Sequence, residues 1–183
     1  MKKIRLYLVI MLLTSITFSC SDDDDAGENT SVIGSGTGSA VVDGDNFTLS
    51  GGAVVDYGSY NDETFNFDIE LLSSDFVLTD DSISGRGENV YFELLTDNAT
   101  GLKNGIYTFN ENGGDFTFIS SDVYLDYDFN LDDGTAIDIT SGTLEITRAG
   151  DNYDLQWNVE GSNGEVITGS YSGTLRLFEE TDL

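Results

Sequence analysis

The strongest constraint on the fold is that apolar and polar residues alternate with a period of two along several stretches of the chain. The segments 63–72, 122–131 and 152–159 each place apolar residues at every second position. Because successive side chains of a β-strand point to opposite faces, each segment is predicted to be a strand with one buried and one solvated face. No window of similar length has helical spacing. We therefore expect an all-β domain.

Short turn sequences separate the predicted strands, among them DNATG at 97–101, NENGG at 110–114 and GSNGE at 161–165. Counting the apolar runs gives about nine or ten strands, and the short loops between them indicate an antiparallel meander. Such a meander can close into a barrel or pack as a two-sheet sandwich, and both arrangements protect strand edges. The sequence leaves both open.

Two details of the alternation make more specific predictions. Ile137 and Ile139 are odd-numbered whereas Leu144 and Ile146 are even-numbered, so the buried parity changes across the Ser141-Gly142 pair. One extra residue in a strand produces this change, which predicts a β-bulge there. In the segment 122–131 the apolar parity continues to Leu131, which predicts one regular strand. The residues predicted to face inward are large (Phe65, Phe67, Phe129, Trp157), so we expect a filled interior.

The N-terminus has the pattern of an export signal. The basic sequence MKKIR precedes an uncharged, mostly apolar run from Leu6 to Phe18. As a helix this run would span roughly 20 Å, which is shorter than a hydrocarbon core of about 30 Å. Ser19-Cys20 at its end resembles a bacterial lipobox, in which the cysteine is acylated and becomes the first mature residue. Cys20 is the only cysteine in the chain, and we predict a signal peptide at 1–19 and lipidation at Cys20.

An acidic run follows the cysteine and resembles the export signal of surface lipoproteins in the Bacteroidota. This resemblance implies a lipid-anchored, surface-exposed protein on the outer membrane, with the periplasmic face as the alternative. Outer-membrane lipid would then be a partner through the acyl chains. The predicted export signal consists of Ser21, Asp22, Asp23, Asp24 and Asp25.

Composition also predicts the domain boundaries. The stretch after the acidic run is rich in Gly, Ser and Thr and is typical of a flexible tether. We expect a lipidated tether at 20–39 and a single all-β domain at 40–183. The segment from Ser141 to Phe178 resembles a strand-turn-strand module that closes many uncharacterised β-rich lipoproteins of the Bacteroidota, with the sequences SGT, NG and GSYSGTL. This resemblance is compatible with a calycin-like barrel and implies no activity.

The charge balance excludes one class of partner. The chain has 34 acidic and 7 basic residues, and its net charge is −27. Only Arg86, Lys103, Arg148 and Arg176 follow position 19, so the mature chain would carry 4 − 34 = −30. A surface of this charge repels phosphates, and we expect no nucleic-acid partner.

The residue inventory does not favour catalysis. Histidine is absent and the one cysteine is assigned to lipid, so Ser-His and Cys-His nucleophile systems and His-ligated zinc are ruled out. Carboxylates are abundant, and paired carboxylates can hydrolyse glycosidic bonds. With so many acidic residues, however, any fold places some pairs close together, so such a pair does not indicate catalysis. We expect a non-catalytic protein without a cofactor. A weak surface calcium site at Asp132 and Asp133, helped by Asp138, is the alternative, since this acidic turn loosely follows a calcium loop.

Aromatic residues are the remaining candidates for ligand binding. Tyr57 and Tyr60 lie in a predicted loop, and Tyr124 lies on the polar parity of its strand, whereas Tyr153 and Trp157 have core parity. Exposed aromatic rings beside carboxylates and amides are typical of sugar platforms. We therefore expect a binding module for glycan or for a neighbouring outer-membrane protein. The alternatives are a structural or adhesion lipoprotein without a small ligand and, less favoured, a small-ligand-carrying β-barrel.

Overall fold

The computed structural model describes residues 33–78 and 83–179, and these two ranges are all-β. In these ranges no helix is long and apolar enough to cross a membrane. The elements are β1 (Gly34–Val42), β2 (Asp45–Ser59), β3 (Phe65–Leu72), β4 (Phe76–Leu78), β5 (Ile83–Thr96), β6 (Gly105–Phe109), β7 (Thr117–Phe118), β8 (Asp122–Asp128), β9 (Asp133–Ala149), β10 (Asn152–Gly161), β11 (Val166–Thr174) and β12 (Arg176–Glu179).

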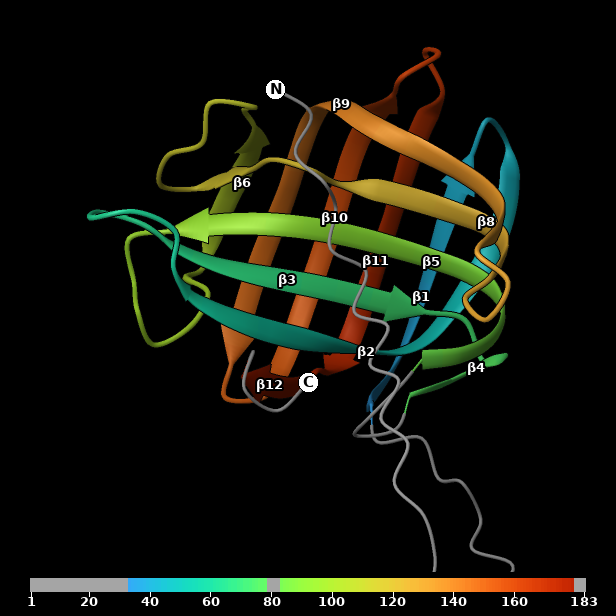
Figure 1. Cartoon of the computed structure of the whole chain (residues 1–183), viewed down its shortest axis with the longest axis horizontal. Helices are drawn as coiled ribbons and strands as arrows, with labels where there is room; N and C mark the ends of the chain where they lie inside the picture. The colour runs from blue at the N-terminus through green and yellow to red at the C-terminus, as the bar shows by residue number, and fades with distance from the viewer. Residues whose placement is uncertain (1–32, 79–82, 180–183) are drawn as a thin grey trace, which may run out of the picture.

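Eight of these strands pair in a closed cycle. The order is β1, β2, β3, β5, β8, β9, β10 and β11, and β11 pairs again with β1. Every step of the cycle is antiparallel, and the cycle follows the order of the chain, with β4 inserted between β3 and β5 and with β6 and β7 inserted between β5 and β8. In Figure 1, β2, β3, β5 and β8 form the near layer, and β9, β10 and β11 run across behind them. The predicted antiparallel meander is confirmed, and it has a barrel-like form.

Four short strands extend the ring. β8 lies between β5 and β9 along only part of their length. Further along, β6 pairs with β9, β7 pairs with β5, and β6 and β7 pair with each other. β12 runs parallel to β2 and begins opposite Ala53, directly after the point where β1 leaves β2 at Gly52. β4 pairs only with the start of β5. These short elements raise the number of strands to twelve, above the nine or ten predicted.

The predicted tether boundary is wrong for residues 34–39, because β1 begins at Gly34. Its glycines are needed where β1 packs closely on β11. A Cβ at Gly36 would lie 2.5 Å from the Tyr171 hydroxyl, and a Cβ at Gly38 would lie 2.6 Å from the Ser170 carbonyl oxygen. The glycines of this segment, which are typical of a linker, therefore allow β1 and β11 to lie close together. Residues 20–32 of the predicted tether and the signal peptide at 1–19 lie outside the described residues.

The predicted bulge in β9 is confirmed. Glu160 pairs with Ser141 but the next residue, Gly161, pairs with Ile139, so Thr140 is the extra residue. Gly142 has a φ of 115°, a value that glycine adopts without strain. As the parity change predicts, residues on both sides of the bulge point inward: Ile137, Ile139, Leu144 and Ile146 are all buried.

The prediction of one regular strand through Leu131 is wrong. β8 ends at Asp128, and a second bulge interrupts it at Asp126, whose φ is 50°. The bulge turns Tyr127 to the outer face, where its ring lies 4.8 Å from that of Tyr124. Phe129 follows onto this face and packs on Phe76 instead of entering the core. Leu131 is 70% exposed in the turn.

The interior of the ring is filled. One cluster of buried side chains spans all eight strands of the cycle, and Phe65 packs against it. Trp157 and Tyr153, which were predicted to be core residues, are each 4% exposed. The largest fully buried side chains are Tyr107, Tyr171, Phe67, Phe92 and Phe118. Such packing does not favour a carrier that holds a ligand inside the barrel.

Candidate functional site

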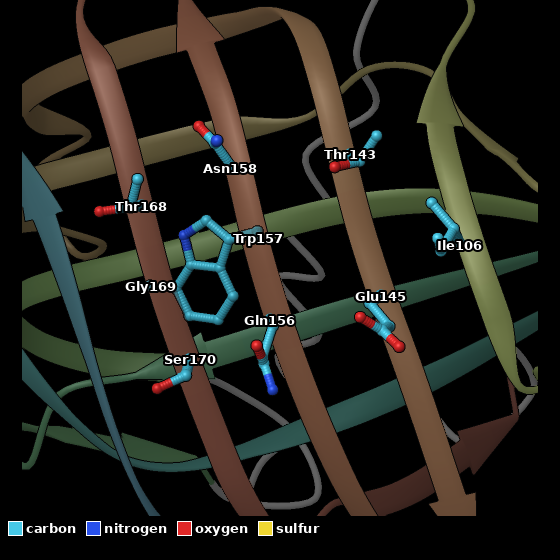
Figure 2. A pocket seen from close by; sticks show the side chains of 9 residues that line it. All are labelled: Ile106, Thr143, Glu145, Gln156, Trp157, Asn158, Thr168, Gly169 and Ser170. Carbon is cyan, nitrogen blue, oxygen red and sulfur yellow. The ribbon is translucent and has the colours of Figure 1, made fainter.

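A hollow of about 320 Å³ lies on the outer surface of β9, β10 and β11 (Figure 2). Strand register explains which side chains meet there. Asn158 of β10 pairs with Thr143 of β9 and Thr168 of β11, and two residues earlier Gln156 pairs with Glu145 and Ser170. Because alternate residues of a strand share a face, these two rows form a grid on one face. We call this site the hollow; it is lined by Thr143, Glu145, Gln156, Asn158, Thr168 and Ser170, with Ile106 of β6 at its side.

The floor of the hollow depends on one glycine. Trp157 and Gly169 pair between the two polar rows, and their side-chain positions point to the interior. The indole lies across Gly169, as Figure 2 shows, and a Cβ on this glycine would lie 2.1 Å from Cζ2 of the ring. Only a residue without a side chain leaves space for the tryptophan here. Gly169 and Trp157 together form a flat base beneath the grid.

The polar groups of the hollow are available to a ligand. In the described ranges, no hydrogen bond joins the side chain of Thr143, Gln156, Asn158, Thr168 or Ser170 to another group of the protein. The grid thus offers amide and hydroxyl groups that can both donate and accept. Glu145 adds an acceptor, and Ile106, which is 59% exposed, adds an apolar surface. Hydroxyls and amides around a small apolar contact suit a neutral, hydroxyl-rich ligand.

The predicted tyrosine platform does not come together. Tyr57 and Tyr60 are 37% and 40% exposed and lie at the end of β2 where Phe65 pairs with Thr96. Tyr124 is half-buried and pairs with Asn89, seven residues earlier on β5. At about 3.3 Å per residue, these two positions are separated by about 23 Å along the strand. All three tyrosines lie outside the hollow, and their binding role stays a prediction.

The residues of the predicted calcium site are also spread out. Asp132 accepts a hydrogen bond from the Tyr127 hydroxyl, and Asp133 lies 3.8 Å from Arg86. Asp138 lies five residues further along β9, about 17 Å away, and pairs with Asp122. Among the residues that the structure describes, no three carboxylates are grouped as metal ligands. Calcium binding here stays a prediction.

Arg86 is held beside the acidic turn that was considered for calcium, by Asp126 of β8. Its Nε donates to Asp126 Oδ1 at 2.6 Å and its second terminal nitrogen donates to Asp126 Oδ2 at 2.9 Å. This two-bond contact lowers the pKa of Asp126 and raises that of Arg86. A cation of the protein thus lies next to Asp133, one of the predicted calcium ligands.

Cys20 and the predicted export signal, Ser21 to Asp25, lie outside the described residues. Comparisons with known proteins add no identification: no family model, no curated protein and no solved structure matches the chain. The class that the fold defines is therefore an all-β, barrel-like domain with a polar hollow on one outer face.

Sequence reasoning missed every residue of the hollow. Thr143, Gln156, Asn158, Thr168 and Ser170 each occupy the polar parity of a strand, where solvated residues are expected. Their grouping depends on the register between β9, β10 and β11, which no single strand reveals. One signal was present, since Gly169 interrupts a predicted strand and such a glycine marks close approach of another group.

Proposed function

We propose that this protein is a non-catalytic lipoprotein of the outer-membrane surface that binds glycans in the hollow over β9, β10 and β11. The observation that carries the proposal is the grid of six polar side chains, in which amides and hydroxyls are not used by the protein. A sugar presents many hydroxyls that both donate and accept hydrogen bonds, and it also has an apolar C–H face. The grid matches the first property and Ile106 the second.

The position of the hollow fits display on a lipid anchor. The described chain enters the ring at the start of β1, near Gly34. Thr168 and Ser170 of the hollow pair with Val41 and Ser39 of β1. The hollow is thus about 17–23 Å along β1 from the entry point. With Cys20 acylated, a ligand would meet the hollow away from the anchored end of the domain.

A glycan array followed by calorimetry tests the proposed ligand class. The full chain, as the cell produces it, is purified in mild detergent and screened, and positive glycans are titrated into variants. Asn158→Ala removes an amide of the grid, and we expect at least tenfold weaker binding, since an unpaired polar partner costs about 1–3 kcal/mol. Asn152→Ala is the matched control because it lies on the same strand and face, outside the hollow. We expect this control to change affinity less than twofold.

The alternative functions give different results. If Tyr57→Ala or Tyr60→Ala abolishes glycan binding and Asn158→Ala does not, the exposed tyrosines are the site and the hollow is not. If no glycan binds under any condition, the protein is better described as a structural or adhesion component.

Anchoring and location are tested separately. Intact-mass analysis of the protein from its native cells should show acyl chains on Cys20 as the first residue. Protease treatment of living cells should then remove the domain from the surface. An unmodified thiol, or a domain that resists the protease until cells are opened, would contradict the proposed location.

A further inference from the structure

The hollow is the central part of a longer band of side chains. A row of residues, each paired with the next, crosses six neighbouring strands in the order β2, β1, β11, β10, β9 and β6 (Figure 1). Its members are Thr48, Ser39, Ser170, Gln156, Glu145 and Ile106. A second row lies two residues further along each strand and consists of Asn46, Val41, Thr168, Asn158, Thr143 and Thr108. We call these two rows the polar band.

The polar groups of the band are available beyond the hollow as well. The residues between its two rows belong to the core, as Ala40, Trp157 and Tyr107 show, so the rows themselves point outward. The members outside the hollow are exposed or half-buried. In the described ranges four of these side chains make no hydrogen bond to another group of the protein: Ser39, Asn46, Thr48 and Thr108. Neutral donors and acceptors therefore continue from the hollow to both ends of the band.

The rows on either side of the band differ from it, because their side chains bind one another. On one side Ser172 pairs with Asp154, and its hydroxyl donates to the Asp154 carboxylate at 2.6 Å. On the other side Ser141 pairs with Glu160, and its hydroxyl donates to the Glu160 carboxylate at 3.4 Å. The available polar groups thus form a strip that is two residues wide and has carboxylates along both long sides.

The dimensions of the band indicate an extended ligand. Neighbouring strands lie about 4.8 Å apart, so the band is about 24 Å long, whereas its two rows are only about 6.6 Å apart along each strand. A strip of this shape fits a polymer chain that lies across the strands, and it extends well past a single sugar in the hollow. Val41 on β1 and Ile106 on β6 lie on opposite sides of β9, β10 and β11. They supply apolar contacts for the C–H faces of sugar rings.

The charge of the band favours a neutral ligand. Glu145 is the one charged member of the band, and Asp154 and Glu160 lie in the rows beside it. These carboxylates and the acidic chain as a whole repel a polymer that carries carboxylate, sulfate or phosphate groups. Sugar hydroxyls, by contrast, can donate to Glu145 and accept from the amides of the band. Neutral polysaccharides therefore match the band better than anionic ones.

The floor of the hollow adds an independent sign of a ligand. Trp157 lines the hollow and is 4% exposed, and its Nε1 donates no hydrogen bond within the described chain. Figure 2 shows this nitrogen on the side of the indole toward Thr168. A buried N–H without an acceptor is unfavourable. An acceptor oxygen that a ligand brings into the hollow would satisfy this donor.

We infer that the polar band binds an extended stretch of a neutral, linear polysaccharide, which lies across the strands from β2 to β6. The hollow is the central subsite, and Thr48 and Thr108 mark the two ends of the bound stretch. This assignment rests on the glycan-binding function proposed above, and it adds the length, direction and charge of the ligand. A longer chain fills more of the band, so affinity rises with the number of sugar residues until the band is covered.

Titration with oligosaccharides of increasing length tests the inference. The probes are oligomers of cellulose, xylan, mannan and amylose, from the disaccharide to the hexasaccharide, with hexagalacturonate as the anionic probe. They are titrated into the full chain as the cell produces it, in mild detergent. Trp157 is the only tryptophan of the chain, so its emission reports binding in the hollow, and calorimetry gives the affinity.

Two variants on β2 test the end of the band. Thr48→Ala removes a hydroxyl from the band, two strands away from the nearest residues of the hollow. Its matched control, Ser50→Ala, removes a hydroxyl from the next outward-pointing residue of β2, beyond the band. Circular dichroism verifies that both variants fold.

We expect at least one neutral hexasaccharide to change the Trp157 emission and to bind at least tenfold more tightly than its disaccharide, while hexagalacturonate does not bind. Thr48→Ala should weaken the hexasaccharide about fivefold and leave the disaccharide unchanged, since only the longer chain reaches β2. Ser50→Ala should change either affinity less than twofold.

The possible failures are distinguishable. If the disaccharide binds as tightly as the hexasaccharide, or if Thr48→Ala has no effect while Asn158→Ala weakens both ligands, the hollow alone is the site. The extended band is then wrong and the proposed glycan function stands. The extended band is also wrong if none of the neutral hexasaccharides binds. If Asn158→Ala weakens no glycan, the proposed function fails as well.

Discussion

The two outer faces of the ring differ in how their polar groups are used. On β9, β10 and β11 the polar side chains of the hollow are mostly uncharged. Within the described chain, five of these six side chains make no hydrogen bond to another group of the protein. On β3 and β5 the outer face holds the carboxyl groups of Asp68 and Glu70, and burial raises the pKa of both. They accept hydrogen bonds from Asn66, Tyr91 and Asn89, and we call these five residues the acidic face. Both faces are built by the same register rule on one filled core. The comparison teaches that internal hydrogen bonding and burial, more than fold, separate a polar face that is open to a ligand from one that is not.

Each face should also affect stability in its own way. The buried carboxylates of the acidic face are costly where they ionise, so its variants should change the free energy of unfolding. The exposed grid of the hollow should be nearly neutral for stability, apart from its glycine floor. The predictions below test this difference in order of expected effect.

The largest effect is expected at the floor of the hollow. Gly169→Val would place side-chain atoms where the Trp157 indole lies, since even a Cβ would come within 2.1 Å of the ring. Overpacking of this kind should lower the free energy of unfolding by about 3 kcal/mol. Chemical denaturation measures it. Thr168→Val, on the same strand but pointing outward, is the control and should cost less than about 0.5 kcal/mol. Equal costs for the two variants would show that the indole does not need the glycine.

The next effect depends on pH. The folded pKa of Glu70 is about 7 against an ordinary value of 4.5. Below pH 4.5 both states are protonated; between pH 4.5 and 7 only the unfolded state ionises, so stability falls as pH rises. Glu70→Gln removes this loss and should stabilise the protein by about 2 kcal/mol at pH 8, but not at pH 4. Denaturation at both pH values measures the difference. A gain that is the same at pH 4 and pH 8 would contradict the raised pKa.

A smaller effect is expected from one hydroxyl of the acidic face. Tyr91→Phe removes the donor that binds Asp68, and it should lower the free energy of unfolding by about 1 kcal/mol. Tyr60→Phe removes a hydroxyl from a residue that is 40% exposed, and it serves as the control with an expected change near zero. Thermal unfolding of the two variants compares them. If both behave alike, the hydrogen bond to Asp68 does not stabilise the fold.

The smallest effect on stability is expected in the hollow. Gln156→Ala removes an exposed amide without a hydrogen-bond partner in the described chain, so the free energy of unfolding should change by less than about 0.5 kcal/mol. Glycan affinity should nevertheless fall, because the amide belongs to the grid. Denaturation and calorimetry on the same sample separate the two quantities. A large loss of stability would mean that the grid has a structural role instead.

Much of the fold could be predicted because its signal is local. The alternation in β3, β9 and β10 defines the strands, and the parity change near Gly142 predicts the bulge in β9. Two predictions failed where tertiary contact overrides local pattern. Gly36 and Gly38 resemble a linker but pack against β11, and Asp126 forms a bulge where the alternation appears regular.

The candidate site could not be predicted, because it arises between strands. Thr143, Asn158 and Thr168 look like separate solvated residues, and only the pairing of β9, β10 and β11 places them in one row. The same holds for Glu70, Asp122 and Asp138 on the opposite layer. The sequence alone predicts which face of the sheet each side chain is on. Which residues are neighbours across strands can be known only from the register between the strands.

Nuclear magnetic resonance on one isotope-labelled sample tests most directly whether the hollow is the glycan site. A glycan identified by the array is added, and the shifts of backbone amides are followed. The account predicts that the glycan shifts amides of residues 143–145, 156–158 and 168–170 and leaves those of residues 68–70 and 89–93 unchanged. If the glycan shifts amides of the acidic face, or if neither set responds, the assignment of the glycan to the hollow is contradicted.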